Sequence, residues 1–91
     1  MKIEFDPVKS QLNVEGRGLS FELAEAFDFD SALIVEDARR DYGETRYRAT
    51  GRLNESVAVI VFTLRDDMVR IVSLRLANRK ERLAYAEKEQ D

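Results

Sequence analysis

The sequence contains no cysteine, and this absence excludes several kinds of chemistry at once. Without a thiol the chain has no disulfide, no thiolate nucleophile, no CxxC redox pair and no thiolate metal site. Histidine is absent too, which removes the commonest acid–base group at neutral pH and the commonest metal ligand. Any catalysis must therefore use carboxylates, tyrosine, lysine or arginine. We expect no metal ion and no cofactor.

Long apolar runs and linker segments are also lacking. No stretch approaches the roughly 18 apolar residues that a membrane-spanning helix needs, and the opening Met-Lys-Ile-Glu-Phe-Asp does not resemble a signal peptide. No Pro-, Gly- or Ser-rich segment divides the 91 residues, so we expect one domain over residues 1–91. With 44% apolar and 36% charged residues, the composition is typical of a folded, soluble chain. We expect a cytoplasmic protein with no membrane partner.

Charge is unevenly distributed along the chain. The net charge of −3 by itself disfavours nucleic acid as a partner. Residues 1–45, however, carry five basic and eleven acidic side chains, a net −6, whereas residues 46–91 carry ten basic and seven acidic ones, a net +3. The second half can therefore form a basic working surface beside an acidic body.

The first third of the chain is predicted to hold a short strand and two helices. Residues 2–5 alternate polar and apolar side chains, which favours a strand. Asp6-Pro7 is typical of a helix start, and Gly16-Arg17-Gly18 of its end. The side chains that this helix is expected to contribute are Val8 and Leu12, with Lys9 and Asn13 as further candidates. Ser20 is predicted to cap a second helix, whose apolar stripe is Phe21, Leu23, Ala24 and Phe27.

Four strands and a final helix are predicted in the remainder. The strands are expected at 32–35, 46–53, 57–64 and 68–76, with an exposed polar loop at 37–44. Residues 57–64 are apolar on both faces, which places them in the middle of the sheet. Asn78 and Glu81 have the spacing of a capping box, so a helix should run over 79–89 and pack through Leu83 and Tyr85. The fold class is α+β: a short N-terminal strand and two helices, an antiparallel four-stranded meander, and a C-terminal helix.

Simple alternation along 68–76 separates the two arginines of this strand. It places Arg75 with Val69 and Ile71 on one face and Arg70 on the other. Both can therefore serve one site only if Arg75 lies beyond the strand end or a β-bulge resets the register.

Four segments in this order resemble the BrnT toxin family. The most specific are GLSFE at 18–22 and RIVSLRLANRKE at 70–81, and the resemblance covers nearly the whole chain. The matching positions are Glu4-Phe5-Asp6, Lys9, Asn13, Gly18 to Glu22, Ala24, Phe27, Asp30, Gly43-Glu44, Arg46, Gly51, Arg70-Ile71, Ser73, Arg75, Ala77, Glu81 and Tyr85. Two features depart from the family: Arg17 stands where its members usually have histidine, and its members are commonly more basic.

The resemblance implies a RelE-like fold and the toxin of a type II toxin–antitoxin system, a ribonuclease that inhibits translation. It also implies a BrnA-like antitoxin partner, whose ribbon-helix-helix part binds operator DNA while the remainder covers the toxin. The toxin itself would then contact operator DNA only through the antitoxin.

Metal-independent RNA cleavage needs a base for the 2′-hydroxyl, positive charge for the phosphorane and a proton for the 5′-oxygen. Arginine suits the second task because its planar fork meets two phosphate oxygens. The predicted catalytic residues are Arg46, Arg70 and Arg75 as charge stabilisers, Glu44 and Glu81 as bases, and Lys9 and Tyr85 as acids. The predicted RNA-binding residues are Arg48, Arg79, Lys80 and Arg82.

These residues also have structural interpretations. Glu81 can be a helix cap, Tyr85 a core residue, and Lys9 a surface ion-pair partner. Two other functions therefore compete with the ribonuclease. One is a toxin-like binding module that keeps the antitoxin but has lost cleavage, and the other is an unrelated α+β domain that associates through a sheet edge.

Overall fold

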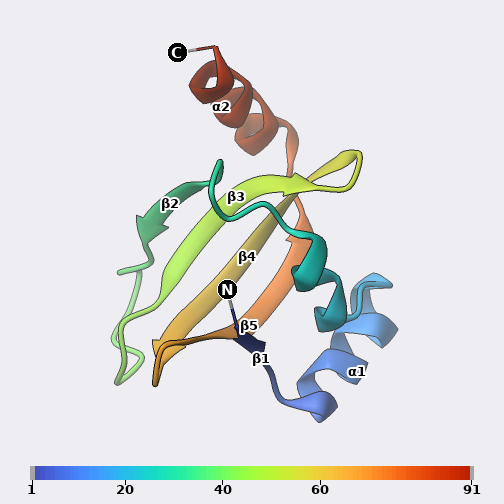
Figure 1. Cartoon of the computed structure of the whole chain (residues 1–91), viewed down its shortest axis with the longest axis vertical. Helices are drawn as coiled ribbons and strands as arrows, with labels where there is room; N and C mark the ends of the chain where they lie inside the picture. The colour runs from blue at the N-terminus through green and yellow to red at the C-terminus, as the bar shows by residue number, and fades with distance from the viewer. Residues whose placement is uncertain (1, 91) are drawn as a thin grey trace.

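A curved five-stranded sheet forms the centre of the structure, a computed structural model that describes residues 2–90 (Figure 1). The strand order is β1-β5-β4-β3-β2, with β1 parallel to β5 and the other neighbours antiparallel. The α+β class is confirmed, and parallel pairing of the short N-terminal strand makes the sheet mixed. The bounds are β1 Ile3–Glu4, β2 Leu33–Glu36, β3 Tyr47–Leu53, β4 Ser56–Arg65 and β5 Met68–Leu76.

The position of β4 in the sheet confirms the prediction from its apolar sequence. It is the middle strand, and its six successive residues 58–63 are all buried. Side chains on both of its faces are therefore removed from water, which explains the absence of polar alternation.

Three helical segments surround the sheet, and their caps follow the sequence. They are α1 (Pro7–Arg17), the 3₁₀ helix η1 (Phe21–Ala26) and α2 (Arg79–Glu89). Asp6 accepts a hydrogen bond from the backbone N–H of Val8 at 2.9 Å, and Gly18 ends α1 with φ of 74°. Asn78 and Glu81 form the predicted capping box of α2.

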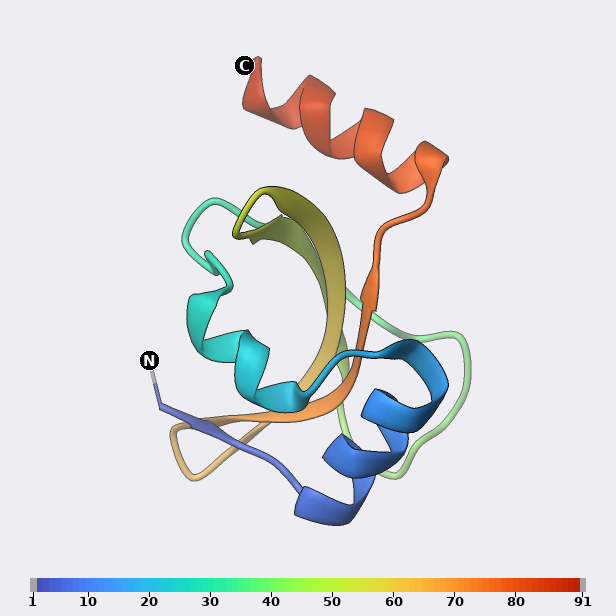
Figure 2. The ribbon, with the colours of Figure 1, turned by 90° about the vertical axis from the view of Figure 1, so that its right-hand side faces the viewer.

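The second helix differs from the prediction in kind. η1 has three residues per turn, so Phe21, Ala24 and Phe27 lie in one line along it, and all three are buried. Figure 2 shows the sheet curling around this segment. The main core lies between η1 and the concave face, which contributes Ile60 and Phe62 from β4.

Gly51 on β3 lets η1 and the following loop approach closely. A Cβ atom added there would lie 2.9 Å from Cζ of Phe27 and 3.0 Å from Cβ of Ala32. Glycine is thus required for space at this position, because the backbone has an ordinary strand conformation.

The packing face of α1 differs from the one that Val8 and Leu12 predicted. Val8 and Leu12 are 67% and 60% exposed, whereas Ser10 and Asn13 are buried. Asn13 Nδ2 donates to the carbonyl oxygens of Leu19 at 2.7 Å and Leu74 at 3.0 Å. Ser10 Oγ accepts the backbone N–H of Phe21 at 2.9 Å. The backbone that α1 covers needs hydrogen-bond partners, and apolar side chains cannot supply them.

The expected packing of α2 is half right. Tyr85 is 1% exposed, as a core residue should be, but Leu83 is 52% exposed and does not pack inward. α2 crosses one end of the sheet (Figure 2), so only a narrow stripe of the helix meets protein. Within residues 2–90, no helix has the length and apolar character needed to cross a membrane.

Candidate functional site

Arginines of β3, β4 and β5 share the sheet face that is turned away from η1. Arg48 lies opposite Val61, Arg70 opposite Thr63 and Arg75 opposite Val59. These three β4 partners alternate along their strand, so they project from one side of the sheet. Arg46 directly precedes β3 and continues the alternation of Arg48. We call Arg46, Arg48, Arg70 and Arg75 the arginine face.

A β-bulge places Arg70 and Arg75 on the same face of the sheet, opposite β4 residues that lie four positions apart. Val61 pairs with Ser73 and Phe62 with Ile71, so Val72 is an extra residue on β5. Strict alternation placed Arg70 and Arg75 on opposite faces, and this assignment is wrong. The bulge absorbs one residue, as the shared site required.

Arg75 is held by Glu81 in a two-pronged ion pair. Its Nη1 and Nη2 atoms lie 2.7 and 2.8 Å from the two carboxylate oxygens. Glu81 also accepts the backbone N–H of Asn78 at 2.9 Å. The hydrogen bonds from Arg75 lower the pKa of Glu81 to about 2 and raise the pKa of Arg75. Glu81 is therefore ionised at neutral pH, and a carboxylate with so low a pKa is a weak base.

An open groove of about 350 Å³ lies beside this ion pair. Arg39, Arg48, Arg75 and Lys80 line it from four different segments, and Glu81 is its acidic member. We call it the basic groove. Four cations around one hollow provide a place for the phosphates of a polyanion.

Arg39, which the sequence did not single out, is held at the basic groove by a two-pronged ion pair with Asp37. Its Nε and Nη2 atoms lie 2.7 and 2.8 Å from the carboxylate of Asp37, whose side chain is 1% exposed. The hydrogen bonds from Arg39 lower the pKa of Asp37 to about 2. The sequence feature that could have indicated this ion pair is the Asp-x-Arg spacing of residues 37–39 after β2. The polar residues of 37–44 predicted an exposed loop, but Asp37 is buried.

The other arginines of the face also have carboxylate neighbours. Glu44 lies 3.3 Å from Arg46, and Glu4 lies 3.5 Å from Arg70. Glu44 also lies 3.7 Å from Arg65. These side chains are partly exposed, so the pairs are accessible to a competing phosphate.

Two predicted acids lie outside the basic groove. Tyr85 is buried beneath α2, with its hydroxyl 3.3 Å from Ser31 Oγ. Lys9 is exposed on α1 and borders a different hollow, together with Arg17 and Ser73. The structure therefore does not bring Tyr85 or Lys9 together with the arginines.

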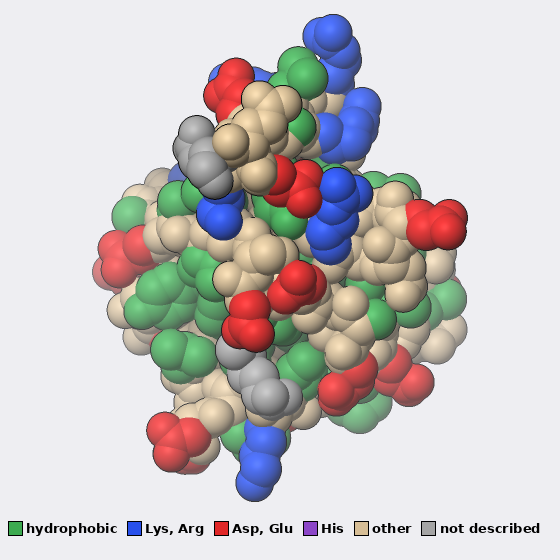
Figure 3. All heavy atoms as spheres, turned by 45° about the horizontal axis from the view of Figure 1, so that its top comes forward, with side chains coloured by type: hydrophobic (Ala, Val, Ile, Leu, Met, Phe, Trp, Pro, Cys, Tyr) green, Lys and Arg blue, Asp and Glu red, His purple; other side chains and the backbone are tan. Residues whose placement is uncertain are grey.

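Of the predicted RNA-binding residues on α2, Lys80 lines the basic groove. Arg79 and Arg82 are exposed on the same helix, and Arg82 donates to the carbonyl oxygen of Ala77 at 2.9 Å. Figure 3 shows basic side chains gathered beside α2, with acidic side chains over the lower part of that view.

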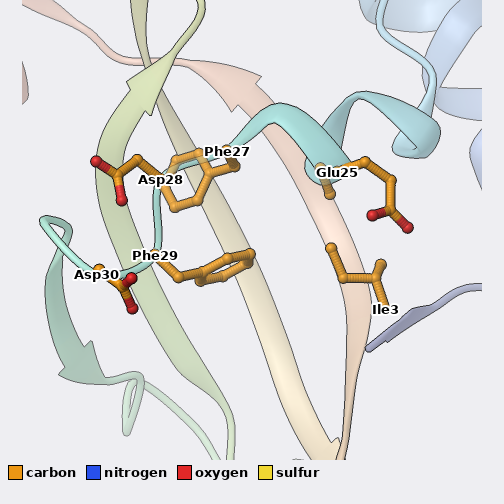
Figure 4. A pocket seen from close by; sticks show the side chains of 7 residues that line it. Ile3, Glu25, Phe27, Asp28, Phe29 and Asp30 are labelled. Carbon is orange, nitrogen blue, oxygen red and sulfur yellow. The ribbon is translucent and has the colours of Figure 1, made fainter. Parts of the chain in front are cut away.

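The opposite side of the sheet carries an acidic hollow (Figure 4). Glu25, Asp28 and Asp30 line it together with Phe27 and Phe29. The hydroxyl of Ser31 donates to Asp28 and lowers the pKa of that carboxyl. Three carboxylates make this hollow unfavourable for a phosphate. Among residues 2–90, no group of three or more His, Cys, Asp or Glu side chains is arranged to hold a metal ion.

Comparison with known proteins agrees with this geometry. The family model described as "Ribonuclease toxin, BrnT, of type II toxin-antitoxin system" matches residues 5–81. The matched region includes the whole arginine face and Glu81, and it ends inside α2. A comparison with curated proteins found no match. Since the family model covers most of the sequence, this chain belongs to the BrnT family of ribonuclease toxins of type II toxin–antitoxin systems.

Proposed function

We propose that this chain cleaves RNA at the arginine face by metal-independent transfer of the phosphodiester to the neighbouring 2′-hydroxyl. A bond forms between the 2′-oxygen and phosphorus, and the bond from phosphorus to the 5′-oxygen breaks. The 2′-hydroxyl loses a proton to a base, and the leaving 5′-oxygen gains one. The remaining barrier lies in the extra negative charge on the phosphorane.

The observation that carries the proposal is the bulge at Val72. It turns Arg70 and Arg75 toward the side of the sheet that already holds Arg46 and Arg48. Of these four, Arg48 and Arg75 line the basic groove, together with Arg39 and Lys80. Guanidinium groups fixed around one hollow stabilise developing phosphorane charge without reorganising, which is the requirement for electrostatic catalysis.

We assign different roles to the two candidate bases. Glu44 lies outside the basic groove but beside Arg46 on the arginine face, where it is partly exposed, and it is the proposed base for the 2′-hydroxyl. Glu81, with its pKa of about 2, is a positioning residue that aims the fork of Arg75. Tyr85 and Lys9 lie away from the groove, so neither is the proposed proton donor, and water in the open groove can protonate the leaving oxygen.

The antitoxin and fold relationships belong to the same proposal. Family membership implies an antitoxin, and we propose a BrnA-like protein whose ribbon-helix-helix part binds operator DNA. We further propose that the α+β fold is RelE-like. Copurification of the chain with the product of an adjacent gene tests the partner, and a neighbourhood without any short DNA-binding gene argues against it.

The test is expression of the chain alone in a bacterium. We expect growth arrest and RNA degradation, both relieved by Arg75→Ala. Arg52→Ala is a matched control, because Arg52 also pairs with a glutamate of α2, Glu89 at 3.0 Å, but lies outside the basic groove. It should remain toxic. Arg75→Lys, which keeps the charge and loses the fork, should cleave slowly. Unaffected growth at good soluble expression contradicts the proposal.

A second function is favoured by one feature of the arginine face. Arg46, Arg70 and Arg75 already have carboxylate partners that an RNA phosphate must displace. The alternative is a toxin-like module that binds the antitoxin without cutting RNA. It predicts that purified chain binds its antitoxin but leaves RNA intact.

A further inference from the structure

Tyr42 lies in the loop between β2 and β3, directly beside the arginine face. The guanidinium carbon of Arg46 is 4.1 Å from the centre of the Tyr42 ring, and that of Arg40 is 5.6 Å away. The Tyr42 hydroxyl lies 3.5 Å from the carboxylate of Asp37. The ring is only half-buried.

This location distinguishes Tyr42 from the other aromatic side chains of residues 2–90. All the others are either fully buried or packed against the main core: Phe5, Phe21, Phe27, Phe29, Tyr47, Phe62 and Tyr85. Tyr47, which lies between Arg46 and Arg48 in the sequence, stacks on Phe62 with the ring centres 5.4 Å apart. Among the aromatic rings of residues 2–90, Tyr42 is therefore the one that does not pack in the core.

The hollow around Tyr42 has mixed charge, unlike the basic groove. Its volume is about 340 Å³, and two arginines and four carboxylate residues line it beside Tyr42: Arg40, Arg46, Glu36, Asp37, Asp41 and Glu44. Polar groups with this excess of carboxylates do not favour a phosphate. They suit a neutral planar group that both donates and accepts hydrogen bonds, which describes an RNA base.

We propose that Tyr42 and the guanidinium of Arg46 form a stacking site for an unpaired RNA base next to the phosphate on the arginine face. This inference rests on the proposed function. Arg46 and Arg48 are two residues apart along one strand, about 7 Å, so a nucleotide with its phosphate at Arg48 can place its base at Tyr42. Proteins commonly read single-stranded RNA by stacking bases on aromatic rings and on guanidinium planes.

The test couples a protein change to a change in the RNA. The probe is a single-stranded 2′-O-methyl oligonucleotide, which lacks the attacking hydroxyl and stays intact, together with a set in which one nucleotide at a time is abasic. Binding is measured by fluorescence anisotropy at one fixed salt concentration. For the unchanged protein we expect one abasic position to weaken binding about fivefold or more, the usual size of a lost stacking contact.

Tyr42→Ala should weaken binding of the intact oligonucleotide by the same factor and abolish the additional abasic effect. Tyr42→Phe keeps the ring and loses the hydroxyl, so it should bind like the unchanged protein. An abasic penalty that persists in Tyr42→Ala overturns the inference. So does a Tyr42→Phe variant as weak as Tyr42→Ala, since the hydroxyl contact to Asp37 would then be what matters.

The outcome is separable from that of the cleavage experiment. A chain that leaves RNA intact but shows coupling between Tyr42 and one base retains the stacking site and loses the ribonuclease proposal. A chain that cleaves RNA and shows no such coupling retains the ribonuclease and loses the stacking site.

Discussion

Replacing Asn13 by alanine tests whether a polar contact, rather than an apolar one, holds α1 on the sheet. The side chain is 9% exposed, and its amide donates to two carbonyl oxygens, one of them on the edge of β5. Asn13→Ala leaves both carbonyl groups without this donor.

The expected cost follows from these contacts. Each lost hydrogen bond is worth about 1–1.5 kcal/mol, and the missing side-chain volume adds about 1 kcal/mol. Alanine returns roughly 0.6 kcal/mol through its higher helix propensity. The net loss in the free energy of unfolding is about 2.5–3.5 kcal/mol. For a domain of this size it corresponds to a fall in Tm on the order of 10–20 °C.

Urea denaturation of the purified protein, followed by far-UV circular dichroism, measures this loss. Gln11→Ala is the matched control, because Gln11 is exposed on the same helix and should leave stability unchanged or slightly raised. Asn13→Asp keeps the size but replaces the donor by a carboxylate oxygen, so it should be at least as destabilising as alanine. A loss below about 0.5 kcal/mol for Asn13→Ala would refute the reasoning.

Three further outcomes are expected. Gly51→Ala should destabilise the fold by about 1–3 kcal/mol through overpacking. Gly16→Ala, at a helical position with open space around it, should stabilise the fold by about 0.5–1 kcal/mol. Thermal melts should therefore show a lower Tm for the first variant and a higher Tm for the second. The pKa values of Asp37 and Glu81 are lowered from 3.8 and 4.5 to about 2, so the stability from their ion pairs is complete above pH 4.5 and is lost as the pH falls toward 2. Acid titration of Glu81→Gln should therefore show a shallower fall than the unchanged protein. Tyr85→Phe should cleave RNA at the normal rate because the hydroxyl is buried, and a cleavage assay showing a large loss would restore Tyr85 as the acid.

Local signals in the sequence predicted most of the elements. The Asp6-Pro7 start, the capping box of α2 and the doubly apolar strand β4 each depend on neighbouring residues, and each is present in the structure. The pairing of β1 with β5 joins residues that lie far apart in the sequence, so no local pattern indicates it.

The candidate site shows the same division. Arginine-rich alternation identified Arg46 and Arg48 correctly as neighbours on one face. The relation of Arg70 to Arg75 depended on a bulge, and the position of a bulge is set by the partner strand rather than by the bulged sequence. The packing face of α1 could not be predicted from its apolar residues. Apolar side chains mark the buried face of a helix only where the backbone that it covers is already hydrogen-bonded, and α1 covers carbonyl groups that need a donor.

The separation of charge across the sheet has a consequence for how the toxin meets a polyanion. The acidic hollow and the basic groove lie on opposite sides of the sheet, so their side chains contribute an electric dipole across it in addition to the net charge of −3. At distances beyond the Debye length of about 8 Å, the field is screened and encounters have random orientation. Closer in, the dipole rotates the domain until its arginine side leads. Approach of a polyanion to the basic groove is therefore favoured by orientation at short range rather than by bulk attraction, because the net charge of the chain is negative.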